Sequence, residues 1–204
     1  MALFLLEFSS SARSRDEVRP LLDQVAEAVR RAGGEFIEAQ VPTHLEPVYV
    51  VVEHGDERAG EALLQRAVDE GGVPARAIAR VRLVGAMLDE VKASRRTADY
   101  LVEWDFPAGL TMDAYLARKK ANSPRYAEVP EVRFLRTYVC EDMSKCLCFY
   151  LAHDEAAVRR AREAVSAPVT RLARLTAPGG TARTAGRPAS GGAVQALGAG
   201  GDHA

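Results

Sequence analysis

Apolar residues alternate with polar ones, or recur at helical spacing, in segments whose order repeats across residues 1–176. Each copy reads as strand, helix, strand, strand, helix and strand. The first copy has predicted strands at 3–8, 36–41, 48–53 and 78–83 and predicted helices at 16–32 and 56–67. The second has predicted strands at 100–104, 132–139, 147–151 and 169–175 and predicted helices at 112–120 and 154–165. The pattern therefore predicts one unit that occurs twice.

The order β-α-β-β-α-β is that of the split βαβ, or ferredoxin-like, unit, so the predicted fold class is α+β. Such a unit has a four-stranded antiparallel sheet with both helices on one face, which leaves the other face apolar and uncovered. We expect the two units to cover each other sheet to sheet, as a single-chain pseudo-dimer that resembles a dimeric α/β barrel. Unit 1 is predicted at 1–84, a linker with a short helix at 85–97, and unit 2 at 98–176.

The last segment, 177–204, differs in composition from the rest of the chain. It holds eight of the sixteen glycines, and its branched apolar residues are Val194 and Leu197. Burial of so little apolar surface does not offset an ordering entropy of about 1–2 kcal/mol per residue. We therefore predict a disordered tail.

Charge and hydropathy narrow the function classes. The formal net charge is −1, so no surplus of Lys and Arg marks a nucleic-acid-binding protein. No apolar run reaches the roughly 18 residues of a membrane span, and Glu7 interrupts the first apolar segment too early for a signal peptide. Three cysteines do not make a disulfide framework. We expect a cytoplasmic protein with no nucleic-acid or membrane partner.

The predicted strand at 146–150 contains several side chains that could take part in chemistry. Alternation separates Cys146, Cys148 and Tyr150 from Leu147 and Phe149. We expect the leucine and phenylalanine to pack on the helices and the other three to face the space between the units. The paired strand is expected to add Phe134, Arg136, Tyr138 and Cys140 to that space. Such a mixture is typical of a small-molecule pocket, or of an ordinary interface between the units.

Two residue sets could ligate a metal. Cys146 and Cys148 are predicted about 6–7 Å apart on one strand face, with Cys140 nearby, but the C-x₂-C zinc pattern is absent. Buried cysteines also act as small apolar residues. His54 and His153 occupy equivalent places in the two copies, after the third strand. They could converge on a metal or lie as solvated histidines at helix starts.

Glu7 and Glu103 form a third repeated pair, in the first strand of each copy. A buried glutamate has a raised pKa and can act as a general acid or base. The alternative is an ion pair with one of the nearby arginines, which are Arg80, Arg82, Arg171 and Arg174. The basic run at 118–120 is interpreted as a solvated helix face. No established catalytic motif occurs in the sequence.

Residues 98–175 resemble the ferredoxin-like nickel-binding proteins, a family with a domain of unknown function. The resemblance rests on Tyr100–Glu103, Phe134–Val139, Asp142, Cys148–Tyr150, Asp154–Arg159 and Pro168. It implies a ferredoxin-like fold, dimer formation and nickel binding. The family often has histidines where this chain has Arg136 and Ala161, and His153 stands where a proline is usual. Asp142 and Cys148 are the polar positions that carry over.

Three functions follow from these observations. The first is a metal-binding protein that holds nickel or another divalent transition metal with Cys146, Cys148, His153 and Asp142. The second is a cofactor-independent oxygenase, isomerase or cyclase with Glu103 and Tyr138 as acid and base in an inter-sheet pocket. The third is a binding module without chemistry. The expected partners are a metal ion or small molecule and a second copy of the chain.

Overall fold

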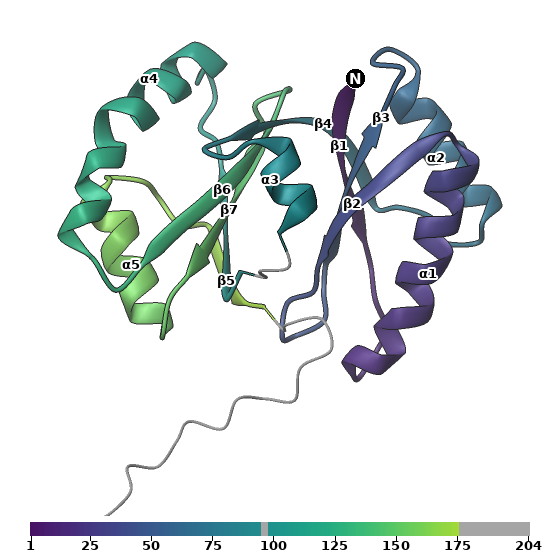
Figure 1. Ribbon diagram of the computed structural model, residues 1–204, viewed down its shortest axis with the longest axis horizontal. Helices are drawn as coiled ribbons and strands as arrows, with labels where there is room; N and C mark the ends of the chain where they lie inside the picture. The colour runs from purple at the N-terminus through teal and green to yellow at the C-terminus, as the bar shows by residue number, and fades with distance from the viewer. Residues whose placement is uncertain (95–97, 176–204) are drawn as a thin grey trace, which may run out of the picture.

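The computed structural model describes residues 1–94 and 98–175 (Figure 1). The first half contains β1 (Ala2–Phe8), α1 (Arg15–Arg31), β2 (Gly34–Gln40), β3 (Val48–His54), α2 (Gly60–Glu70) and β4 (Ala77–Val84). Helix α3 (Leu88–Ala93) follows. The second half contains β5 (Tyr100–Asp105), α4 (Met112–Asn122), the 3-10 helix η1 (Ser123–Glu128), β6 (Arg133–Cys140), β7 (Lys145–Leu151), α5 (Glu155–Ala164) and β8 (Arg171–Arg174). The predicted tail at 177–204 lies outside the described residues.

The strands form one eight-stranded antiparallel sheet in the order β2-β3-β1-β4-β6-β7-β5-β8, which confirms the α+β class. We expected two separate four-stranded sheets. Instead β4 pairs with β6, from Val81 opposite Cys140 to Val84 opposite Thr137. An edge strand carries a row of unpaired N–H and C=O groups, and this pairing satisfies them for one edge of each half.

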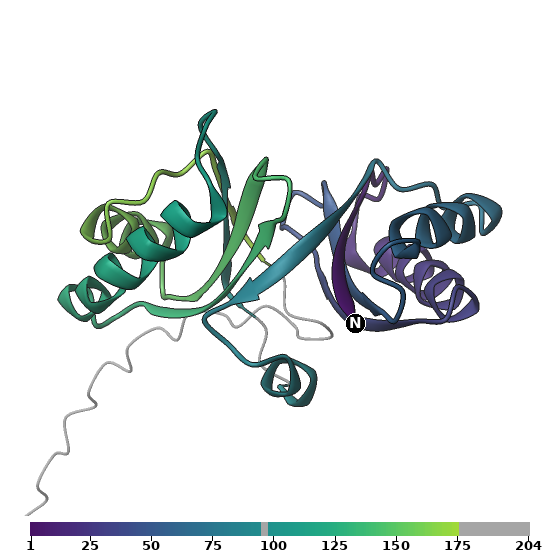
Figure 2. The same cartoon turned by 90° about the horizontal axis from the view of Figure 1, so that it is seen from above.

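The two ends of the sheet also approach each other. Pro42, after β2, forms an isolated bridge with Leu175, after β8, and Thr43 N donates to Arg174 O at 2.8 Å. The sheet therefore curls so that one face points inward. Helices α1 and α2 lie outside one half of it, and α4 and α5 lie outside the other (Figures 1 and 2).

Local sequence explains where the helices begin. Ser14 caps α1 by accepting from Glu17 N, and Asp154 caps α5 by accepting from Ala157 N. Asp56 does not cap α2 as expected, because that helix begins later, at Gly60. Asp56 instead accepts from the backbone N–H groups of the two residues before Gly60. Among the described helices, none has the length and apolarity that a membrane crossing requires.

The core has three parts, one under each helical layer and one inside the curled sheet. The inner part includes Leu5, Val51, Leu101, Tyr138, Leu147 and Phe149. Cys146, Cys148 and Tyr150 belong to the core beneath α4 and α5. The predicted assignment of the two faces of β7 is therefore wrong. Both faces of β7 are buried, so alternation separated the side chains but could not tell which set faces the helices.

Strand β6 matches the prediction in part. Its register shifts between Phe134 and Arg136, so a bulge interrupts the alternation there. Tyr138 and Cys140 lie in the inner core as expected, whereas Phe134 packs against the core on the helical side. The bulge is the physical reason why one strand sends its predicted set of side chains to two faces.

Candidate functional site

Two cysteines on β7 lie side by side under the helices of the second half. The Sγ atoms of Cys146 and Cys148 are 3.8 Å apart, and both side chains are buried. They meet because residues two apart on a strand share a face. Cys140 belongs to the inner core on the other side of the sheet, so the third thiol does not join the pair.

The surroundings of Cys148 favour its thiolate. Cys146 donates a hydrogen bond to it, and the cations Arg162 and Lys119 lie nearby, which together hold the pKa of Cys148 well below its usual range. Arg162 Nη1 and Thr137 Oγ1 each donate to Cys148 Sγ at 3.3 Å. Burial, and the charge on Cys148, raise the pKa of Cys146 well above its usual range. Of the two thiols, Cys148 is therefore the more acidic.

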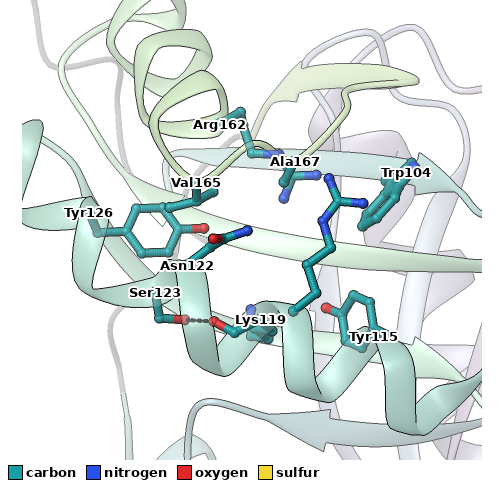
Figure 3. A pocket seen from close by; sticks show the side chains of 10 residues that line it. Trp104, Tyr115, Lys119, Asn122, Ser123, Tyr126, Arg162, Val165 and Ala167 are labelled. Atoms are coloured by element: carbon teal, nitrogen blue, oxygen red, sulfur yellow. Dashed lines mark hydrogen bonds between the residues drawn. The ribbon is translucent and has the colours of Figure 1, made fainter.

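A pocket of about 30 Å³ lies next to this pair, between α4, η1 and α5 (Figure 3). Arg162 and Lys119 line the pocket and also contact or approach Cys148. Tyr115, which lines it too, hydrogen-bonds Cys146. These three side chains therefore separate the pocket from the thiols.

The cations of the pocket form cation–π contacts with aromatic rings. The guanidinium carbons of Arg118 and Arg162 lie 5.5 Å and 5.9 Å from the centre of the Trp104 ring. Lys119 Nζ lies 4.0 Å from the centre of the Phe134 ring and donates to Thr137 Oγ1 at 3.2 Å. Each contact combines charge with the negative face of a π system.

The basic run at 118–120 is thus not a uniformly solvated face. Lys119 points toward the sheet, and burial lowers its pKa. Sequence reasoning also missed Arg162, which is buried. Helical spacing could have found it, because Arg162 follows the buried Val158 by four residues and therefore shares its face of α5.

The other predicted metal ligands lie elsewhere. Asp142 is in the turn before β7, where it accepts from Ser144 N at 2.9 Å, and the exposed His153 follows the opposite end of that strand. His54 is buried, donates from Nε2 to Ala32 O at 2.9 Å and accepts from Asp56 N at 3.0 Å. Within residues 1–94 and 98–175, no three His, Cys, Asp or Glu side chains are grouped to hold a metal ion.

The two repeated glutamates meet inside the curled sheet. Lys145 Nζ lies 2.5 Å from Glu7 Oε1 and 3.2 Å from Glu103 Oε1. Glu103 also pairs with Arg171 at 2.8 Å and accepts from the Tyr49 hydroxyl at 2.8 Å. Burial raises the pKa of Glu103, but these donors and the nearby cations outweigh it, and the pKa lies below its usual value. The ion-pair alternative is confirmed for Glu103, with Arg171 as its partner, whereas Glu7 pairs with Lys145 and not with one of the four arginines considered.

Tyr138 is held as a neutral phenol. Its hydroxyl donates to Glu38 at 2.5 Å, and Arg136 pairs with the same carboxylate. Burial and the Glu38 charge raise the pKa of Tyr138. The cavity beside Glu103 measures about 10 Å³, which is room for about one water molecule.

Comparison with known proteins finds a family match in the second half of the chain. Residues 100–175 match the model of the family described as nickel responsive protein SCO4226-like, which confirms the family resemblance of this half. The matched segment contains the cysteine pair and the pocket beside it. No curated protein matches the chain.

Two solved structures resemble the chain at a distance. A candidate chlorite dismutase is 13% identical, with 86% of this chain and 95% of that chain covered and a TM-score of 0.49. A candidate monooxygenase from Lactobacillus acidophilus is 10% identical, with 86% and 92% covered and a TM-score of 0.48. At these scores neither fold nor activity carries over to this chain.

Proposed function

We propose that the chain is a metal-responsive binding protein and that Cys146 and Cys148 are its metal ligands. The observation that carries the proposal is the 3.8 Å separation of their Sγ atoms. Two metal–sulfur bonds of about 2.3 Å, the length known for zinc, span this separation when the S–metal–S arrangement is bent to about 110°. The pair is therefore spaced for chelation before a metal arrives. The match of this half to a nickel responsive family also supports a metal-related role.

The donor set does not fit nickel itself. Imidazole suits Ni²⁺, but His153 lies beyond the end of β7 and His54 bonds within the first half. Paired thiolates select soft ions such as Cu⁺. The cations Arg162 and Lys119 beside the thiols also oppose a second positive charge more than a single one. We therefore propose Cu⁺ as the ion that this pair binds.

A competition titration of the full chain tests this proposal. Cu⁺ is titrated against a chromogenic Cu⁺ chelator, and Ni²⁺ and Zn²⁺ are titrated separately. We expect about one Cu⁺ per chain, lost in the Cys146→Ser/Cys148→Ser variant. Cys140→Ser is the matched control, because this thiol is buried on the opposite face of the sheet and should leave binding unchanged. Binding that survives the double substitution, or no binding against the chelator, contradicts the proposal.

The enzyme alternative requires Glu103 or Tyr138 to exchange protons with a substrate between the sheets. Glu103 is an ion-paired carboxylate with a lowered pKa, and Tyr138 is bonded to Glu38. The 10 Å³ cavity beside Glu103 is too small for an organic substrate. These observations favour the metal-binding function over the enzyme.

The tandem arrangement is part of the same proposal. The first half has the strand order β4-β1-β3-β2, and the second half has the equivalent order β8-β5-β7-β6. Equal order in both halves supports a duplicated ferredoxin-like unit, with boundaries near 84 and 98, that forms a single-chain pseudo-dimer. In this arrangement the second unit holds the metal and the first unit covers its inner sheet face.

A further inference from the structure

The pocket between α4, η1 and α5 has an excess of positive charge. Arg118, Lys119 and Arg162 line it, and among the described residues no carboxylate side chain lines it. The ion pairs of the described residues do not include these three cations. Two other arginines of α5, close to Arg162 in sequence, do form ion pairs: Arg159 pairs with Glu155 at 2.6 Å and Arg160 pairs with Glu131 at 2.7 Å.

Arg162 supplies a second, independent observation. It is 3% exposed, and its Nε–H is a buried donor without a hydrogen-bond partner within the described parts of the chain. The other end of the guanidinium is engaged, because Nη1 donates to Cys148 Sγ and the Tyr150 hydroxyl and Nη2 donates to Pro168 O. Buried donors are nearly always paired, with protein, water or a bound group. This donor belongs to a side chain that lines the pocket.

The pocket walls are aromatic as well as basic. Figure 3 shows Trp104, Tyr115 and Tyr126 arranged around the same space as Arg162. The cavity of about 30 Å³ holds about two water molecules, which is the size of one carboxylate group. A cavity of this size admits a carboxylate group alone, so the rest of an organic ligand would lie outside it, against the partly exposed Tyr126.

We propose that this pocket binds a small organic carboxylate, with the carboxylate group in the cavity beside Arg118 and Arg162 and its apolar body outside the cavity. A guanidinium presents paired donors that match a carboxylate. Arg118 Nη2 donates to Ser166 O, so one edge of this guanidinium is positioned by the chain. The pocket shares Arg162 with the proposed metal site, so its test uses chain freed of metal.

Trp104 makes the test direct, because it is the single tryptophan of the chain and it lines the pocket. Its fluorescence is followed while the full chain is titrated with phenylacetate, 2-phenylethanol, acetate and inorganic phosphate. We expect a saturable change with phenylacetate and binding at least about tenfold weaker for 2-phenylethanol, which lacks the charge. Acetate and phosphate are also expected to bind more weakly, because they lack the apolar body.

Variants locate the interaction. Arg118→Met is expected to weaken phenylacetate binding about tenfold or more, since one charge-assisted hydrogen bond is lost. This side chain is exposed, so the variant should fold, whereas Arg162→Met removes a buried group. Lys120→Met is the matched control, because Lys120 is the exposed neighbour on α4 and does not line the pocket.

Four results would overturn the proposal. Equal binding of 2-phenylethanol would remove the role of the charge, and phosphate binding as tight as phenylacetate would assign the pocket to inorganic anions. No saturable change, or an unchanged affinity in Arg118→Met, would show that the basic pocket is not a carboxylate site.

Discussion

Lys145 joins the two repeated glutamates inside the curled sheet, and Lys145→Met is expected to destabilise the protein. The ammonium lies 2.5 Å from Glu7 and 3.2 Å from Glu103, and its side chain is 18% exposed while the carboxylate side chains are 10% and 3% exposed. Loss of one partner from a buried ion pair costs about 3–5 kcal/mol. Glu103 keeps Arg171 and Tyr49, so we expect a loss near the lower end, about 3 kcal/mol.

The assay is urea unfolding at neutral pH, followed by circular dichroism. The glutamates raise the pKa of Lys145 above its usual 10.5 even though burial opposes this, so its contribution is complete below pH 10.5 and is lost as pH rises through the folded pKa. Glu7→Gln/Lys145→Met should recover part of the loss, because one unpaired charge is removed. Arg159→Met, in an exposed pair, should change the free energy of unfolding by less than about 1 kcal/mol. A Lys145→Met variant as stable as wild type would refute the reasoning.

Three further predictions rest on single contacts. Glu103 has a lowered pKa, so its contribution to the free energy of unfolding is complete above pH 4.5 and falls as pH drops through the folded pKa. Urea unfolding at pH 7 and at acid pH should therefore show that the free energy of unfolding depends less on pH in Glu103→Gln than in wild type. Gly60→Ala should cost about 1–2 kcal/mol in the free energy of unfolding, because a Cβ there would lie 2.8 Å from Phe4 Cζ and overpacking outweighs the gain in helix propensity. Arg162→Met should raise the pKa of Cys148, measured by the ultraviolet absorbance of the thiolate; a thiolate titration that matches wild type would contradict the role given to Arg162.

The order of strands and helices could be predicted because local periodicity determines it. The pairing of β4 with β6 could not, since it depends on which edges meet after both halves have folded. The faces of β7 were reversed because its side chains are apolar or small on both faces, so the sequence carried no polar marker of the solvent side.

The candidate site was predicted in part for similar reasons. The cysteine pair followed from strand alternation, and the ion pairing of Glu103 followed from the nearby arginines. The pocket did not, because Lys119 and Arg162 have long side chains that usually carry their charge to solvent. A cation on the buried face of α5 is visible in the helical spacing, but its burial depends on packing against β7.

X-ray absorption of the copper-loaded full chain tests the central claim most directly. We predict two sulfur atoms bonded directly to the metal, supplied by Cys146 and Cys148. This sulfur signal should persist in Cys140→Ser and disappear in Cys146→Ser/Cys148→Ser. A metal surrounded by nitrogen and oxygen atoms alone, or a sulfur signal that the double substitution leaves unchanged, would contradict it.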